Sequence, residues 1–133
     1  LLAGYFLIRS VKKEIERKMI SDVFCIIVKG DLPAEVIYKD DDFLVIKDIN
    51  PQAPVHLLII PVKHYDSLED FMESDSALLG RSLIVAHKVA HQTGLADKGY
   101  RIIINEGEYG GKLVPHLHIH LLGGKRLGPK LVK

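Results

Sequence analysis

The sequence predicts a single domain of the α+β class, with short strands, one long helix and a short helix near the N-terminus. Three observations predict this class. The chain has 133 residues, which is close to the commonest size of one domain. Several short apolar runs have the length of strands, and only one long segment repeats apolar residues at helical spacing. We assign residues 21–133 to the domain and residues 1–20 to a helical N-terminal extension.

The first helix of the domain is short. Ser21 and Asp22 are of the residue types that cap helix N-termini, and the apolar run 24–29 follows them. Gly30 and Pro33 come next in the chain. Because glycine favours the end of a helix and proline cannot continue one, we expect the helix to end there.

Three strands are predicted next. The apolar runs 36–38 and 43–47 are separated by three aspartates at 40–42, which indicates a hairpin. The run 55–60 is almost entirely apolar, as in a strand that is buried on both faces. Pro61 ends this third strand because proline has no N–H group for a sheet hydrogen bond.

One long helix follows, which Ser74 opens and Gly94 closes. Its core face is predicted from apolar residues three and four positions apart, namely Leu79, Leu83, Ala86 and Ala90. His87 and His91 lie one turn apart on this helix, a spacing that can chelate a metal ion. Since the acidic residue of the usual helical metal motif is missing, we interpret them as surface histidines.

Two further strands and a loop complete the domain. A strand is expected at 101–105, and a loop with three glycines follows at 106–111. Pro115 then leads into a strand predicted over 116–122.

Composition excludes several classes of protein. Lys and Arg number 18 against 17 Asp and Glu, so the net charge of +1 does not favour a nucleic-acid partner. The apolar start of the chain is eight residues long, which is too short to span a membrane. Cys25 is the single cysteine, which excludes an internal disulfide and fits the reducing cytoplasm.

Three histidines alternate with apolar residues near the C-terminus. On a strand, His116, His118 and His120 share one face, because successive side chains point to opposite sides. The apolar residues between them suit the core, so the histidines are expected to face an open surface or cleft. Three chemistries use such a row: metal binding, anion binding by protonated imidazoles, and nucleophilic attack on phosphorus. The nearby Gly-rich loop suits a phosphate, because its N–H groups are unobstructed.

Several segments together resemble the histidine triad (HIT) family, and most closely its Hint-type nucleoside phosphoramidases. They are the stretches 48–56 (DINPQAPVH), 105–107 (NEG), 110–111 (GG) and 116–124 (HLHIHLLGG). The resemblance extends in order from about residue 21 to residue 127. It implies a five-stranded, mostly antiparallel sheet with one long helix. It also implies a homodimer whose two sheets join into one of ten strands.

The resemblance assigns catalytic roles to four histidines. His118 is the expected nucleophile, which attacks the α-phosphorus and forms a nucleotidyl-histidine intermediate. His116 is expected to hold the other ring nitrogen of His118 with its backbone carbonyl. His120 is expected to contact the phosphate, and His56 to orient or protonate near the leaving group.

The same resemblance assigns a nucleotide-binding set. Asp48 is expected to accept hydrogen bonds from the ribose hydroxyls, and Ile49 and Phe24 to flank the base. Asn105 and the backbone of Gly111 are expected to hold the phosphate.

The sequence departs from the Hint-type pattern near this set. Leu113 stands where a Ser or Thr is usual, which removes a hydroxyl expected to contact the phosphate or leaving group. Lys112 stands where Gln is usual, and its ammonium can partly substitute as a phosphate contact. The family's Trp-containing tail is missing, and the chain has no tryptophan.

A structural zinc site is a further expectation from the resemblance, because some bacterial members hold zinc with a C-x-x-C pair and two histidines. In this chain the corresponding residues are Asp22, Cys25, His64 and His116. One thiolate, one carboxylate and two imidazoles are acceptable zinc ligands.

Taken together, these observations predict a hydrolase of purine nucleoside 5′-phosphoramidates, such as adenosine 5′-phosphoramidate. The products are a nucleoside monophosphate and an amine, and no redox cofactor or obligatory metal is needed. Two alternatives stay open: a nucleotide-binding regulatory dimer with little catalysis, and a dinucleoside polyphosphate hydrolase.

Overall fold

The computed structural model describes residues 22–132, so the predicted helical extension over residues 1–20 lies outside the described residues. The helices and strands, in chain order, are α2 (Val23–Lys29), β1 (Val36–Lys39), β2 (Phe43–Lys47), β3 (Val55–Pro61), α3 (Ser76–Gln92), β4 (Tyr100–Ile104) and β5 (Ile119–Gly123). Two 3₁₀ turns, η1 (Leu68–Asp70) and η2 (Glu73–Asp75), precede α3. None of these helices combines the length and apolar character needed to cross a bilayer.

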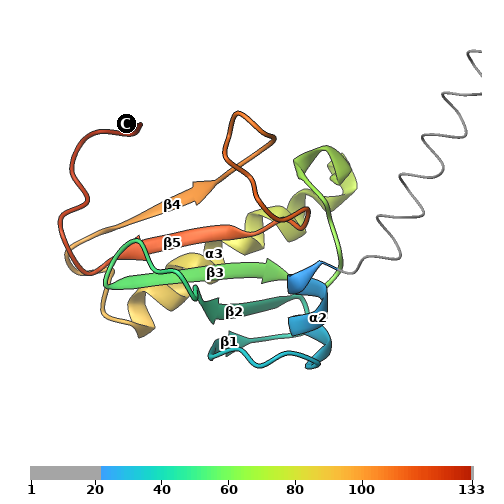
Figure 1. Ribbon diagram of the computed structural model, residues 1–133, viewed down its shortest axis with the longest axis horizontal. Helices are drawn as coiled ribbons and strands as arrows, with labels where there is room; N and C mark the ends of the chain where they lie inside the picture. Colours follow the sequence, from blue (N-terminus) through green and yellow to red (C-terminus); the bar gives the residue numbers. More distant parts are fainter. Residues whose placement is uncertain (1–21, 133) are drawn as a thin grey trace, which may run out of the picture.

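The five strands form one antiparallel sheet in the order β1-β2-β3-β5-β4 (Figure 1). The fold class is therefore the predicted one. The hairpin of β1 and β2 forms around Asp40, whose carboxylate accepts the N–H groups of Asp42 and Phe43. The predicted strand covered residues 55–60. In the structure Pro61 is the last residue of β3, where it lies opposite Phe43.

Apolar side chains cover both faces of the sheet. On one face α3 packs against inward residues of β2, β3 and β5, including Val45, Ile59 and Leu121. On the other face the short helix α2 packs Phe24 against a smaller cluster that includes Leu58. From His56 to its end β3 is buried on both faces, which confirms the prediction made from its nearly continuous apolar run.

The ends of α2 follow its sequence. The Asp22 carboxylate accepts the N–H of Cys25 at 2.8 Å, which caps the first turn. Gly30 closes the helix with a φ of 84°, a left-handed conformation that glycine adopts without a steric penalty. A two-turn helix is marginal by itself, so packing on the sheet must hold α2 in place.

Two predictions were wrong in detail. The core face of α3 is formed by Ser82, Val85, Ala86, Val89 and Ala90, whereas Leu83 is 47% exposed, because the helix turns this residue away from the sheet. Strand β5 begins at Ile119 and not at residue 116. The N–H of residue 117 bonds to the carbonyl of Tyr65 instead of to a sheet partner, so the segment before residue 119 crosses to the loop after β3.

Candidate active site and metal centre

A cavity of about 390 Å³ lies between α2, the turn before β3 and the start of β5. It brings together nearly all the residues that the sequence predicted for catalysis and nucleotide binding. Those that line it are Phe24, Asp48, Ile49, His56, Asn105, Gly111, Leu113, His118 and His120. Lys112 and His116 do not line it.

His118 is held in one orientation inside this cavity. Its Nδ1–H donates to the backbone carbonyl of His116 at 2.7 Å. Because a carbonyl can only accept, this bond fixes the proton on Nδ1 and leaves Nε2 with a free electron pair. Burial lowers the pKa of His118 below its ordinary value, although the bond to the carbonyl opposes the shift. The ring is therefore neutral near pH 7, which is the form that acts as a nucleophile.

A chain of hydrogen bonds determines which nitrogens of the two other cavity histidines carry protons. The backbone N–H of Gln52 donates to Nδ1 of His56 at 3.0 Å, so the His56 proton is on Nε2. That Nε2–H donates to Nδ1 of His120, 2.9 Å away. The proton of neutral His120 is then on Nε2.

Nε2 of His120 is buried and has no hydrogen-bond partner within residues 22–132. Burial, followed by the nearby positive forms of His118 and His56, lowers the pKa of His120 to about 4. Because a buried unsatisfied donor is costly, an N–H group without a partner, on a ring that lines the cavity, points to a bound group that accepts a hydrogen bond.

Asp48 lies at the edge of this network. Its carboxylate is 3.3 Å from Nε2 of His56 and accepts the N–H of Asn50 at 2.8 Å. Asp48, His56 and His120 also converge closely enough to suggest a metal site. However, Nδ1 of His56 already accepts the N–H of Gln52, and Nε2 of His56 carries the proton that His120 accepts. His56 therefore has no free electron pair for a cation, and this set does not fit a metal site.

The mouth of the cavity is apolar. Ile49 and Leu113 are both 92% exposed on its lining, and Phe24 packs its ring 4.9 Å from that of His118. Leu113 also lines a neighbouring cavity of about 710 Å³. An exposed apolar side chain thus occupies the position where a hydroxyl was expected.

The Gly-rich loop differs from its predicted role. The N–H of Gly111 donates to the carbonyl of Glu108 at 3.0 Å and so belongs to the turn, not to an open phosphate cradle. The ammonium of Lys112 bonds to the carbonyl of Asp66 and lies 3.7 Å from the carboxylate of Glu106. The structure therefore turns Lys112 away from the cavity, because these two acceptors hold it elsewhere.

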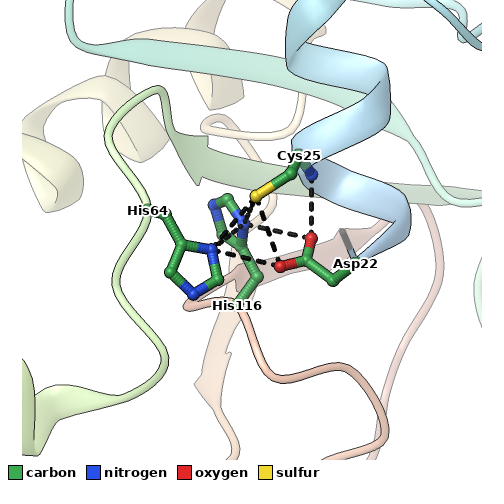
Figure 2. A group of neighbouring side chains, drawn as sticks. All are labelled: Asp22, Cys25, His64 and His116. Atoms are coloured by element: carbon green, nitrogen blue, oxygen red, sulfur yellow. Dashed lines mark hydrogen bonds and ion pairs between the residues drawn. The ribbon is translucent and has the colours of Figure 1, made fainter. Parts of the chain in front are cut away.

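The first triad histidine belongs to a second cluster, which Figure 2 shows. The ring of His116 is completely buried and points to Asp22 and Cys25 at the start of α2 and to His64 after β3. The prediction that all three triad histidines face one cleft was therefore wrong. The segment before β5 is not a regular strand, so the alternation of faces does not extend to residue 116.

The donor atoms of this cluster lie 3.1–3.4 Å apart, which is slightly closer than in an ideal tetrahedral zinc site. Tetrahedral zinc bonds of about 2.0–2.3 Å place ligand atoms roughly 3.3–3.8 Å apart. Sγ of Cys25 is 3.1 Å from Nδ1 of His64, 3.4 Å from Nδ1 of His116 and 3.3 Å from the Asp22 carboxylate. The two Nδ1 atoms are 3.2 Å apart, and Asp22 oxygens lie 3.1 Å from His64 and 3.2 Å from His116.

Hydrogen bonds from Nε2 of His116 and of His64 to neighbouring acceptors leave both Nδ1 atoms free to bind a metal. Nε2–H of His116 donates to the carbonyl of Pro61 at 3.1 Å, and Nε2–H of His64 donates to the carboxylate of Asp66. Both Nδ1 atoms therefore face the centre without a proton, as in zinc-bound histidines whose other nitrogen is held by an outer partner. Burial, aided by Asp22, raises the pKa of the Cys25 thiol to about 11, so only a bound cation would make it a thiolate. The residues fit a divalent metal.

Sequence reasoning did not find three contributors to these sites. The N–H of Gln52 sets the His56 proton, the carbonyl of Pro61 holds His116, and Asp66 holds His64. Two of them act through backbone atoms, for which the sequence carries no signal. The carboxylate of Asp66, two residues after His64, was the one that residue type could have suggested.

Comparison with known proteins identifies the family. A model of the HIT domain matches residues 29–127. The chain belongs to the HIT family. It is 43% identical over 109 residues to the purine nucleoside phosphoramidase of Escherichia coli K12, covering 82% of this chain and 92% of that protein.

Solved structures of HIT proteins agree with the fold. A HIT family hydrolase from Clostridium thermocellum superposes with a TM-score of 0.81 at 47% identity, covering 84% of this chain and 97% of that one. A zinc-bound histidine triad protein from Mycobacterium smegmatis gives a TM-score of 0.69 at 38% identity, covering 84% and 80% of the two chains. Membership of the HIT family and the HIT fold are thus established for this chain.

Proposed function

We propose that the protein hydrolyses the P–N bond of purine nucleoside 5′-phosphoramidates through a nucleotidyl intermediate on His118. One observation carries the proposal: a neutral imidazole with a free Nε2 shares a cavity with an unpartnered N–H donor on His120. The first group supplies a nucleophile, and the second supplies a hydrogen bond to the phosphoryl oxygen. The phosphoramidase relative from E. coli supports the choice of substrate.

The proposed reaction has two steps. Nε2 of His118 forms a bond to phosphorus as the P–N bond breaks, and the leaving nitrogen takes a proton from solvent water and departs as an amine. Water then attacks the same phosphorus, displaces Nε2 and releases a proton to solvent, which yields the nucleoside monophosphate and frees the neutral ring. The carbonyl of His116 stabilises the positive charge that His118 gains in the intermediate. His56 keeps His120 oriented, since its own Nε2 proton is bound to that ring.

Nucleoside recognition follows from the outer part of the cavity. Asp48 is the only carboxylate that lines it among the described residues, and a carboxylate can accept both hydroxyls of a ribose. Phe24 and Ile49 offer apolar surface to the base, which an aromatic base can cover. Asn105 lines the cavity as a neutral donor and acceptor for the phosphate side.

We expect the activity to be constant near neutral pH and to decline in acid. Burial lowers the pKa values of His56, His118 and His120, so all three stay neutral well below the pH at which an exposed histidine gains its proton. We expect kcat/KM for adenosine 5′-phosphoramidate to be level from about pH 8 through about pH 6.5, the ordinary pKa of histidine, and to decline only at lower pH. A profile that already declines between pH 8 and 7 would contradict the neutral nucleophile.

We also propose that the functional unit is a homodimer joined through β4. This strand is an edge of the sheet, and unpaired edges invite a second strand. Ile84 of α3 is 67% exposed and lies one turn before His87, which contacts Tyr100 of β4. An apolar side chain therefore stands beside the free edge. Sedimentation should give about twice the 14.9 kDa of the chain, and Ile84→Glu should shift it to monomer without loss of secondary structure.

A divalent ion, most simply zinc, is proposed for the cluster of Asp22, Cys25, His64 and His116. The spacing of the donors and the zinc-bound relative from M. smegmatis support it. Bound there, the metal would supply a structural cross-link between three segments, and the hydrolysis itself needs no redox cofactor. A cytoplasmic location stays a prediction that rests on the single cysteine.

A further inference from the structure

The metal cluster and the nucleotide cavity share parts of the same two segments. The ring of His116 is a ligand of the cluster, while its backbone carbonyl holds Nδ1–H of His118 in the cavity. Phe24 stands in α2 between the ligands Asp22 and Cys25, and its ring packs 4.9 Å from that of His118. Two of the groups that touch the nucleophile are thus carried by backbone that the cluster fixes.

The four ligands come from segments that are otherwise joined by few bonds. Helix α2 is only seven residues long, and residues 116–118 lie outside the sheet ladder. The N–H of Leu117 bonds to the carbonyl of Tyr65, the neighbour of His64, at 2.6 Å. Without a cation, the two Nδ1 atoms would face each other across 3.2 Å with electron pairs, which is unfavourable. One of the two rings must then move.

We propose that metal occupancy of this cluster controls nucleotide binding in the neighbouring cavity. The metal joins α2 to residue 116, and so sets the positions of Phe24 and of the His116 carbonyl against His118. This inference rests on the proposed function, because it assigns a regulation to the same nucleotide site. The weak ligand is Asp22, since a carboxylate binds zinc less strongly than a thiolate, which makes the occupancy responsive to metal supply.

The coupling is reciprocal. If the metal tightens nucleotide binding by some factor, the nucleotide must tighten metal binding by the same factor. Couplings between linked sites are typically about 5- to 150-fold. We expect at least a five-fold effect here, because the shared parts touch the nucleophile directly.

The experiment uses the intact protein and AMP, the expected product, as the probe. Metal analysis should give about one equivalent of zinc, which is then stripped with a chelator and restored. Calorimetry should show that stripping weakens AMP binding five-fold or more and that zinc restores it. Competition with a chromophoric chelator should show that saturating AMP tightens zinc binding by the same factor. Nitrogen-15 NMR should show the Nδ1–H form of His118 in the loaded protein and a mixture of tautomers after stripping.

Two variants and one control sharpen the test. Asp22→Ser keeps an N-cap but removes a ligand, and His64→Gln removes a ligand that does not line the cavity; both should bind AMP like the stripped protein. The control His91→Gln removes one member of a close histidine pair outside both sites, whose Nε2 atoms are 3.1 Å apart, and should keep the full coupling.

Different results would overturn the coupling and the proposed function. Equal AMP affinity with and without zinc, or a zinc affinity that AMP does not change, would overturn the coupling while leaving the proposed function intact. Loss of far-ultraviolet circular dichroism on stripping would also overturn it, because the metal would then support the whole fold. Failure of the zinc-loaded protein to bind AMP would instead refute the proposed function.

Discussion

Replacement of His118 by Asn is expected to lower the turnover of adenosine 5′-phosphoramidate by at least about a thousand-fold. Loss of a nucleophile commonly costs this much or more, because the remaining groups only bind and polarise the substrate. The side chain of Asn can still donate to the His116 carbonyl, so the local backbone should keep its position. Rapid quenching should detect a nucleotidyl-protein in the parent and none in the variant.

The matched control is His91→Gln, which changes an exposed histidine of α3 that does not line the cavity. This variant should keep parental turnover. The same assay should include a diadenosine polyphosphate, and faster cleavage of that compound by the parent would favour the dinucleoside hydrolase. Substantial phosphoramidase activity in His118→Asn would show that another group attacks phosphorus.

Replacement of His120 by Asn should lower kcat by about 100- to 1,000-fold. This is the usual effect of removing one donor that stabilises charge in a transition state. The Asn oxygen can take the place of Nδ1 and accept from His56, but no donor then occupies the position of the unpartnered Nε2. KM should change little, because the bond strengthens as charge develops on the phosphoryl oxygen.

The more conservative His120→Gln should recover part of the lost kcat, since its amide nitrogen can reach the position of Nε2. Comparison of the two variants separates the donor from the packing of the ring. Equal kcat in the Asn and Gln variants would show that the ring, and not its N–H group, is what the reaction requires.

The sequence by itself determined the elements of the fold, because local residue patterns encode them. The capping side chain of Asp22, the left-handed Gly30 and the nearly continuous apolar run of β3 each act over a few neighbouring residues. The histidine row and the segment 48–56 likewise marked the cavity, and the structure brings those distant segments together. Their roles in catalysis stay predictions until the variants above are measured.

Only the tertiary structure decided how the histidines divide between two sites. The sequence placed His116 in a row with His118, but the carbonyl of Pro61 draws its ring to the cluster instead. The sequence predicted Lys112 as a phosphate contact. In the structure its ammonium contacts the Glu106 carboxylate and the Asp66 carbonyl, outside the cavity. Such outcomes depend on backbone atoms and on partners far apart in the chain. No local pattern of side chains encodes those distances, so folding alone decides them.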